Sequence, residues 1–217
     1  MPVIARHRVP ATGKHTVKTN TIKDSVVCLH IEAITFKQLW DNYVTGDPIS
    51  DTKTYPDQCA IRMSATFHKV GVPMASFSEK VITSSNGPGT KIGRVMLDGK
   101  PAATRASELA QWLKLKPFCG LPAKPENITG ADWESKVKGR TGIIMFDHYW
   151  ARTLQEKDPS GGHIDLWNGS RLTISSAEGL LGVIGRGIGL RSAHIPRTTI
   201  GYSDLSQAKI ILFWEIK

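Results

Sequence analysis

The sequence predicts an α+β fold in which helices pack on an antiparallel β-sheet. Helical patterns come first along the chain and strand-like runs come last, which is typical of α+β proteins rather than of alternating βαβ units. The chain has 217 residues, of which 40% are hydrophobic and 22% charged, as in an ordinary globular domain. We therefore expect a single domain over residues 34–217, preceded by a basic extension over residues 1–33.

The N-terminal extension is rich in positive charge. Residues 1–23 contain arginines and lysines but no carboxylate, and the whole chain has a net charge of +9 and a pI near 9.6. A solvated tail explains this charge as well as a binding or delivery arm does, and both interpretations stay open. Basic charge favours an anionic partner, such as nucleic acid, an anionic membrane surface or an acidic wall polymer.

Export and membrane signals are not found in the sequence. The start, MPVIARHRVP, lacks the apolar segment of a signal peptide, and no window reaches the roughly 18 apolar residues of a membrane span. We expect synthesis in the cytosol and no export by the signal-peptide route.

The three cysteines, Cys28, Cys59 and Cys119, do not make a disulfide framework, although two of them could pair and leave one free.

The first elements follow the extension. Residues 21–34 are rich in β-branched side chains and predict a strand, whereas residues 34–44 predict a short helix. Pro, Asp and Gly make residues 46–58 a loop. The next helix is predicted to begin just after Asp57, as its N-cap, and to end at Gly71. One stripe of apolar residues predicts that this helix packs into a core: Ala60, Met63, Phe67 and Val70.

Later segments supply two more helices and the sheet. Residues 84–93 form a turn-rich connection. Residues 103–115 predict an amphipathic helix capped by Thr104, and residues 130–139 predict a short helix. Residues 178–192 stay unassigned because their glycines weaken a helix. Strands are predicted at residues 141–147, 162–169 and 208–216.

Cys59 begins the predicted helix at residues 59–71. A thiol is a useful nucleophile only as thiolate, and the N–H groups and partial positive charge of a helix N-terminus lower its pKa. The same N–H groups can stabilise an oxyanion on an attacked carbonyl, which is worth roughly 3 kcal/mol per donor. On its position alone, Cys59 fits either a catalytic nucleophile or a small buried hydrophobic residue.

A histidine and an aspartate share one face of the predicted strand GHIDLWNG. Strand alternation places His163, Asp165 and Trp167 on that face and the intervening apolar residues on the other. A carboxylate beside an imidazole can fix its tautomer and stabilise the imidazolium. A cysteine at a helix start, followed by a histidine on a distant strand, is the chain order of papain-like enzymes. We therefore predict Cys59 as nucleophile, His163 as base and Asp165 as the orienting residue.

Other candidates surround this constellation. His148 follows Asp147 at the end of a predicted strand and could act as an alternative base or line the site. Arg62 could attract a substrate carboxylate, although a solvated surface position is the simpler interpretation. Side chains that could contact substrate, or belong to the core, are Tyr149, Trp150, Trp167 and Asn168. Because no CxxC, HExxH, Walker loop or GxSxG occurs, we expect no metal and no cofactor.

With these residues identified, the chain resembles the type VI secretion amidase effector family 4. The matching segments are YPDQCAIRMSATFHKVGVPM around the cysteine, TGIIMFDHYWAR, HIDLWNG and the closing AKIILFWEI. They lie within residues 35–217 and leave residues 1–33 unexplained. Some relatives carry an acidic residue after the Asn-Gly turn, but here SRLTISSA has no carboxylate before Glu178. This departure leaves Asp165 as the expected third member.

The resemblance implies a papain-like fold of NlpC type. It implies an amidase, an endopeptidase that cuts peptidoglycan stem peptides between D-glutamate and meso-diaminopimelate. It also implies injection by the type VI secretion machinery into the periplasm of rival Gram-negative cells, and neutralisation by a cognate immunity protein. Carried over by residue, Cys59 matches the family nucleophile and His163 the family base.

Two other classes of function stay open on the residues alone. A papain-like protease or deamidase acting on proteins would use the same catalytic residues. A nucleic-acid-binding module would depend on the basic tail, but no basic stripe interleaved with aromatic residues supports it.

Overall fold

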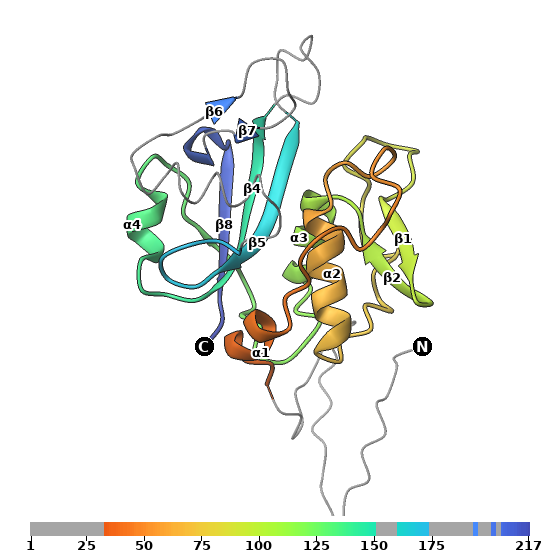
Figure 1. Cartoon of the computed structure of the whole chain (residues 1–217), viewed down its shortest axis with the longest axis horizontal. Helices are drawn as coiled ribbons and strands as arrows, with labels where there is room; N and C mark the ends of the chain where they lie inside the picture. Colours follow the sequence, from red (N-terminus) through yellow and green to blue (C-terminus); the bar gives the residue numbers. More distant parts are fainter. Residues whose placement is uncertain (1–32, 151–159, 174–192, 195–200, 203–204) are drawn as a thin grey trace, which may run out of the picture.

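The computed structural model describes residues 33–150, 160–173, 193–194, 201–202 and 205–217. Figure 1 shows a central sheet, with helices α2 and α3 standing on one side of it and α4 on the other. The two ends of the described chain meet below the sheet, where the backbone N–H of Phe36 donates to the carbonyl of Lys217 at 2.9 Å.

A four-stranded antiparallel sheet in the order β3-β8-β4-β5 forms the centre of the fold. Its strands are β3 (Glu126–Asn127), β4 (Gly142–Trp150), β5 (Gly161–Trp167) and β8 (Ile210–Glu215). The last three occupy the segments predicted as strands, and that prediction is confirmed. Strand β5 lies at the edge, so one side of its backbone has no strand neighbour in this sheet.

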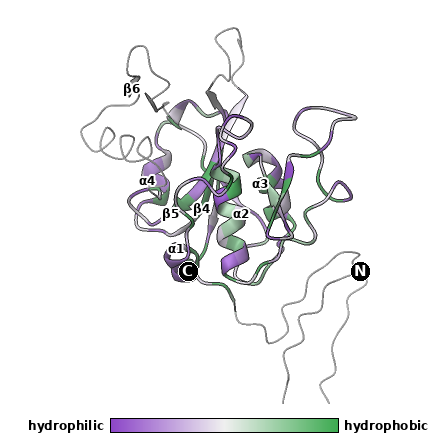
Figure 2. Ribbon diagram, turned by 45° about the vertical axis from the view of Figure 1, so that its right-hand side comes forward, coloured by the Kyte–Doolittle hydropathy of each residue, from purple (hydrophilic) through white to green (hydrophobic). Residues whose placement is uncertain are grey.

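Helices α2 (Cys59–Lys69) and α3 (Ala106–Lys114) pack against one face of the sheet. A short helix, α1 (Phe36–Asp41), closes one end of the same core and lies within the predicted helix at residues 34–44. In Figure 2, hydrophobic residues colour β4, whereas α1 and the last turn of α2 are hydrophilic. The shared core includes Leu39, Met63, Phe67, Leu109, Leu113, Ile143, Ile164 and Leu166.

The opposite face of the sheet is also covered. Helix α4 (Trp133–Val137) and the 3-10 turn η1 (Leu205–Gln207) pack there in a second hydrophobic cluster. The ring of Trp133 lies 4.9 Å from that of Phe146 and 5.4 Å from that of Trp167, both at steep angles. Since Ile164 and Leu166 belong to the first cluster and Trp167 to the second, the predicted alternation of β5 is confirmed.

The N-caps of α2 and α3 differ from the sequence prediction. The N-cap of α2 is Gln58 rather than Asp57, and that of α3 is Arg105 rather than Thr104. Neither cap side chain accepts a hydrogen bond from its helix. At the other end of α2, Gly71 has a φ of +88°, the left-handed conformation that favours glycine just past a helix end.

A hairpin between α2 and α3 is absent from the sequence prediction. Strands β1 (Arg94–Leu97) and β2 (Lys100–Ala103) pair antiparallel around Asp98 and Gly99, both of which have positive φ angles. An Asp-Gly pair between extended segments is a strong hairpin signal. A separate ladder pairs β6 (Ala193–His194) with β7 (Gly201–Tyr202).

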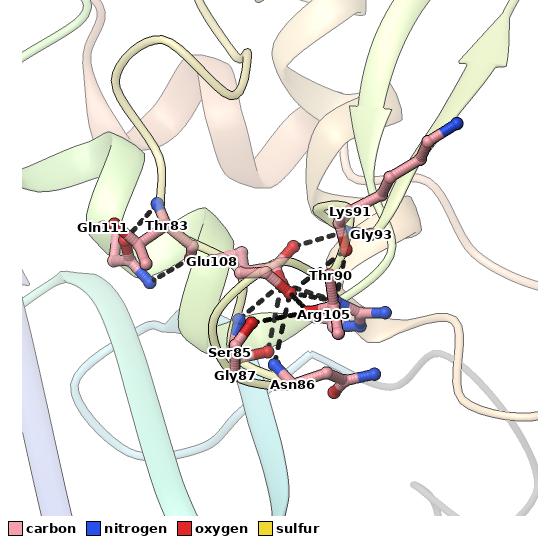
Figure 3. A network of polar contacts seen from close by, with 11 residues as sticks. Thr83, Ser85, Asn86, Gly87, Thr90, Lys91, Gly93, Arg105, Glu108 and Gln111 are labelled. Carbon is pink, nitrogen blue, oxygen red and sulfur yellow. Dashed lines mark hydrogen bonds and ion pairs between the residues drawn. The ribbon is translucent and has the colours of Figure 1, made fainter.

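The connection before this hairpin is anchored on α3 by a buried carboxylate (Figure 3). Glu108, which has no exposed surface, accepts the backbone N–H groups of Ser85 at 2.9 Å and Gly93 at 2.6 Å. Arg105 also donates to it, at 2.7 Å. These bonds satisfy backbone groups that a loop without regular structure would otherwise leave unpaired.

Several predictions fall on other parts of the chain. The basic tail at residues 1–23, most of the strand predicted at 21–34, and the unassigned segment 178–192 lie outside the described residues. The domain boundary near residue 34 therefore stays a prediction. In the described ranges, no helix combines the length and the apolar character that crossing a membrane requires.

Candidate active site

Cys59 is the first residue of α2, as the sequence predicts. It is a free thiol with 7% exposure, whereas Cys119 is disulfide-bonded and Cys28 lies outside the described residues. The preceding Gln58 is fully buried, and its side-chain amide donates to the Ile49 carbonyl at 2.7 Å and accepts the Ile49 N–H at 2.9 Å. Gln58 thus ties the loop before α2 to the helix start.

The edge strand β5 brings His163 to the helix start. The thiol of Cys59 and the imidazole of His163 form a side-chain hydrogen bond, and the backbone N–H of Ile164 also interacts with the sulfur. Nε2 of His163 also lies 3.4 Å from Oδ2 of Asp165. The three predicted catalytic side chains therefore converge in the structure.

Their environment favours a thiolate beside an imidazolium. Burial raises the pKa of Cys59, but hydrogen bonds from His163 and Ile164 and the charges of His163 and Arg62 outweigh burial and hold that pKa below its usual value. Burial lowers the pKa of His163, but hydrogen bonds and charge interactions with Asp165 and Cys59 raise it to about 10. Opposite shifts of neighbouring groups are the arrangement that activates a cysteine nucleophile.

The Asp165 carboxylate is held on both oxygens. The side chain is 2% exposed, and its Oδ1 accepts the Leu166 backbone N–H at 2.8 Å and a hydrogen bond from the Thr173 hydroxyl. Oδ2 is left facing His163. Thr173 comes from SRLTISSA, the stretch in which the sequence shows no carboxylate, and contributes a hydroxyl instead.

Tyr43 is a further neighbour that sequence reasoning missed. It follows α1, packs against the core, interacts with the Thr173 hydroxyl, and feels the charges of Asp165, Arg62 and Cys59. Burial, and next the negative charge of Asp165, raise the pKa of the Tyr43 phenol. No sequence pattern marks this tyrosine, because its approach to the site depends on how α1 docks.

Arg62 is buried, so the interpretation of it as a solvated surface residue is wrong. The residue is 9% exposed, and its Nη1 donates to the Gly46 carbonyl at 3.1 Å and to Oδ1 of Asp47 at 3.2 Å. Its Nε has no hydrogen-bond partner among the described residues. The guanidinium is a buried cation one helical turn from Cys59, and it anchors the loop that leads from Tyr43.

The remaining candidates lie near the end of β4. His148, whose side chain is 45% exposed, pairs with Asp147 at 3.1 Å, and it has a φ of +55° near the end of β4. The backbone of Tyr149 and Trp150 continues β4, and their side chains are not described. No cluster of His, Cys, Asp and Glu suited to a metal ion occurs within the described ranges.

Two candidates, Trp167 and Asn168, have structural roles in the fold. Trp167 is 4% exposed in the second hydrophobic cluster, and its indole N–H donates to the Val137 carbonyl at 2.9 Å. The side-chain oxygen of Asn168 accepts the backbone N–H groups of Ser170 at 3.1 Å and Arg171 at 2.9 Å. Trp167 is a core residue, and Asn168 shapes the turn that leads to Thr173.

The chain is similar to solved structures of two Tae4 effectors. The Tae4 effector of Enterobacter cloacae has 17% identity and a TM-score of 0.49, with 87% of this chain and 99% of that chain covered. The Tae4 effector of Salmonella typhimurium, solved in complex with the immunity protein Tai4 from Enterobacter cloacae, has 18% identity and a TM-score of 0.46, with 84% and 99% covered. Comparison with curated proteins gives no match.

The family match spans most of the chain. Residues 55–214 match the family described as type VI secretion system (T6SS) amidase effector protein 4. That range contains Cys59, His163 and Asp165, the residues that converge at the start of α2. The chain therefore belongs to the amidase effector protein 4 family of the type VI secretion system.

Proposed function

We propose that the protein is an antibacterial peptidoglycan amidase in which Cys59 is the nucleophile and His163 is the general base and acid. The observation that carries the proposal is the hydrogen bond between a thiol at a helix start and an imidazole that also faces a buried carboxylate. Membership of an amidase effector family supplies the reaction class.

In the first step, the thiolate of Cys59 attacks the carbonyl carbon of the scissile amide. A C–S bond forms, and the electron pair of the C=O bond moves to the oxygen. The first N–H groups of a helix have no intrahelical acceptor, so the backbone N–H of Cys59 and a neighbouring first-turn N–H can hold this oxyanion. The side chain of Gln58 is engaged with the backbone of Ile49 through its amide oxygen and one N–H.

In the second step, the imidazolium of His163 gives its proton to the leaving nitrogen. The C–N bond breaks, the amine departs and a thioester remains on Cys59. Neutral His163 then takes a proton from water, and the resulting hydroxide adds to the thioester carbonyl. The C–S bond breaks, the carboxylic acid product leaves, and the thiolate–imidazolium pair is restored. Asp165 stays ionised and stabilises the imidazolium in each half of the cycle.

The substrate in this proposal is the amide between D-glutamate and meso-diaminopimelate in peptidoglycan stem peptides. The proposed contacts with this substrate lie at the end of β4. They are the partly exposed His148 and, beyond it, Tyr149 and Trp150. The positive net charge of +9 would concentrate the enzyme near an anionic wall, in a manner that salt weakens.

Delivery and control follow from the same proposal. The protein would be made in the bacterial cytoplasm, injected by the type VI secretion machinery, and act in the periplasm of the target cell. A cognate immunity protein would protect the producing cell, as suggested by the relative solved with Tai4.

Digestion of isolated sacculi tests the proposed substrate. We expect the wild-type protein to release stem-peptide fragments whose masses correspond to hydrolysis between D-glutamate and meso-diaminopimelate. A matched control is Lys69→Ala, at the exposed far end of α2, which should give the same products. Intact sacculi together with cleaved or deamidated protein substrates would favour the protease or deamidase alternative.

A further inference from the structure

The carboxylate of Asp165 is buried and uses its two oxygens for different partners. Oδ1 accepts the Leu166 N–H and the Thr173 hydroxyl, whereas Oδ2 faces Nε2 of His163. A buried carboxylate is costly unless its acceptor sites are occupied. Saturating one oxygen from the strand and from Thr173 leaves the other oxygen directed at the imidazole.

The direction of the hydrogen bonds follows from the number of protons available. A threonine hydroxyl has one proton, and that of Thr173 is donated to Asp165. The Thr173 oxygen can therefore only accept from the Tyr43 hydroxyl, with which it interacts. Burial raises the pKa of Tyr43, as does the charge of Asp165, so this phenol keeps its proton and remains a donor.

Two backbone contacts hold these groups in place. Next to Tyr43, the Val44 N–H donates to the Thr66 hydroxyl of α2 at 3.1 Å. Before Thr173, a bridge pairs Leu172 with Trp167 at the end of β5. Thr173 itself is 7% exposed. Backbone that the sheet and α2 position thus holds both residues, and the buried Thr173 side chain is shielded from competing water.

From this arrangement we propose that Tyr43 and Thr173 are positioning residues, which form a hydrogen-bonded relay that holds the Asp165 carboxylate with Oδ2 facing His163. The relay runs from the Tyr43 phenol to the Thr173 hydroxyl and then to Oδ1 of Asp165. In this proposal neither Tyr43 nor Thr173 acts on the reacting atoms. Their effect on catalysis passes through the orientation of the carboxylate, and it rests on the catalytic roles proposed above.

Loss of the relay has a specific consequence for His163. Without the Thr173 donor, Oδ1 would keep only the Leu166 N–H, and the carboxylate could rotate away from the imidazole. The imidazolium would then lose part of the stabilisation that a fixed carboxylate gives it. Packing alone would predict no such effect, since valine has nearly the shape of threonine.

The test compares Thr173→Val with Thr173→Ser and Tyr43→Phe by NMR titration of the His163 ring in the resting full-length protein. We expect the pKa of His163 to fall by roughly one unit in Thr173→Val, to fall by less in Tyr43→Phe, and to return toward the wild-type value in Thr173→Ser. The melting temperature of each variant, measured in parallel, identifies any variant that is not folded.

Activity provides a second, separate readout. With peptidoglycan fragments as substrate, Thr173→Val should lower kcat about tenfold with little change in KM, and Thr173→Ser should recover most of it. An unchanged His163 titration in folded Thr173→Val would overturn the positioning role, whatever the substrate is. If the wild-type protein does not cleave peptidoglycan but the titration shifts, the substrate proposal fails and the relay stands.

Discussion

Nε2 of His163 lies 3.4 Å from Oδ2 of Asp165, two residues further along the same strand. Both side chains point to the same face of β5, because strand alternation places residues i and i+2 together. The same strand is at the sheet edge, where the backbone N–H of Ile164 reaches the sulfur of Cys59. One short strand therefore supplies the base, its orienting carboxylate and a donor to the nucleophile.

The pH dependence of kcat/KM should be bell-shaped with a broad plateau. The reactive state is thiolate with imidazolium, and it exists above the lowered pKa of Cys59 and below the raised pKa of His163, at about 10. Activity is expected to rise with pH as the thiolate forms and to fall only as His163 loses its proton. Initial rates over a pH series give both limbs, and an alkaline limb near the ordinary histidine pKa would contradict the ion pair.

Replacing Asp165 by Asn should weaken catalysis and move the alkaline limb to lower pH. Asparagine keeps the shape but removes the charge that helps to raise the pKa of His163. We expect kcat to fall by about 10²–10⁴-fold. The comparison variant is Asp147→Asn, which changes a carboxylate paired with His148 and should leave the alkaline limb in place. Full activity in Asp165→Asn would mean that another group orients the histidine.

Removing the charge of Arg62 should make Cys59 a weaker nucleophile at neutral pH. The Arg62 cation helps to hold the pKa of the thiol below its usual value, so Arg62→Met should raise that pKa. The rate of Cys59 alkylation by iodoacetamide, followed by mass over a pH series, reports the thiolate fraction. Arg62→Lys retains the charge and should stay closer to wild type. Identical profiles for Met and Lys would show that the charge has no effect on the thiol.

Glu108 should be a major stability determinant that is remote from the chemistry. Its carboxylate accepts N–H groups of Ser85, Gly93 and Arg105 in a fully buried position. Glu108→Ala leaves these donors unpaired and should lower the free energy of unfolding by about 3–5 kcal/mol. The half-exposed Glu79, paired with Arg94 at 3.5 Å, is the control, and its alanine variant should change stability by less than about 1 kcal/mol. Equal effects in urea denaturation would refute the anchoring role.

The main elements could be predicted from the sequence because their patterns are local. The apolar stripe of residues 59–71 and the continuous apolar runs of residues 141–147 and 208–216 indicate buried elements before any contact is known. Period-two alternation alone placed His163 beside Asp165. The Asp98-Gly99 pair predicts a turn, and the structure has a hairpin there. The strands of this hairpin are hard to predict, because they are short and have little hydrophobic pattern.

The groups around Asp165 could not be predicted because tertiary contacts select them. Thr173 is one hydroxyl in a stretch rich in Ser and Thr, and only the bridge of Leu172 to Trp167 brings it to the carboxylate. Tyr43 depends on the docking of α1. Arg62 lies on the helix surface by its sequence pattern, but the loop from Gly46 covers it. Arg62 is therefore buried because of the position of that loop as well as its position on the helix.

The catalytic role of Cys59 is tested most directly by digestion of isolated sacculi with the purified Cys59→Ala variant, with products identified by mass. We predict that Cys59→Ala keeps the wild-type melting temperature to within a few degrees, since a small side chain is lost, but releases no split stem peptides. Release of the same stem-peptide fragments by a folded Cys59→Ala protein would contradict the account, because no nucleophile would then be required at the start of α2.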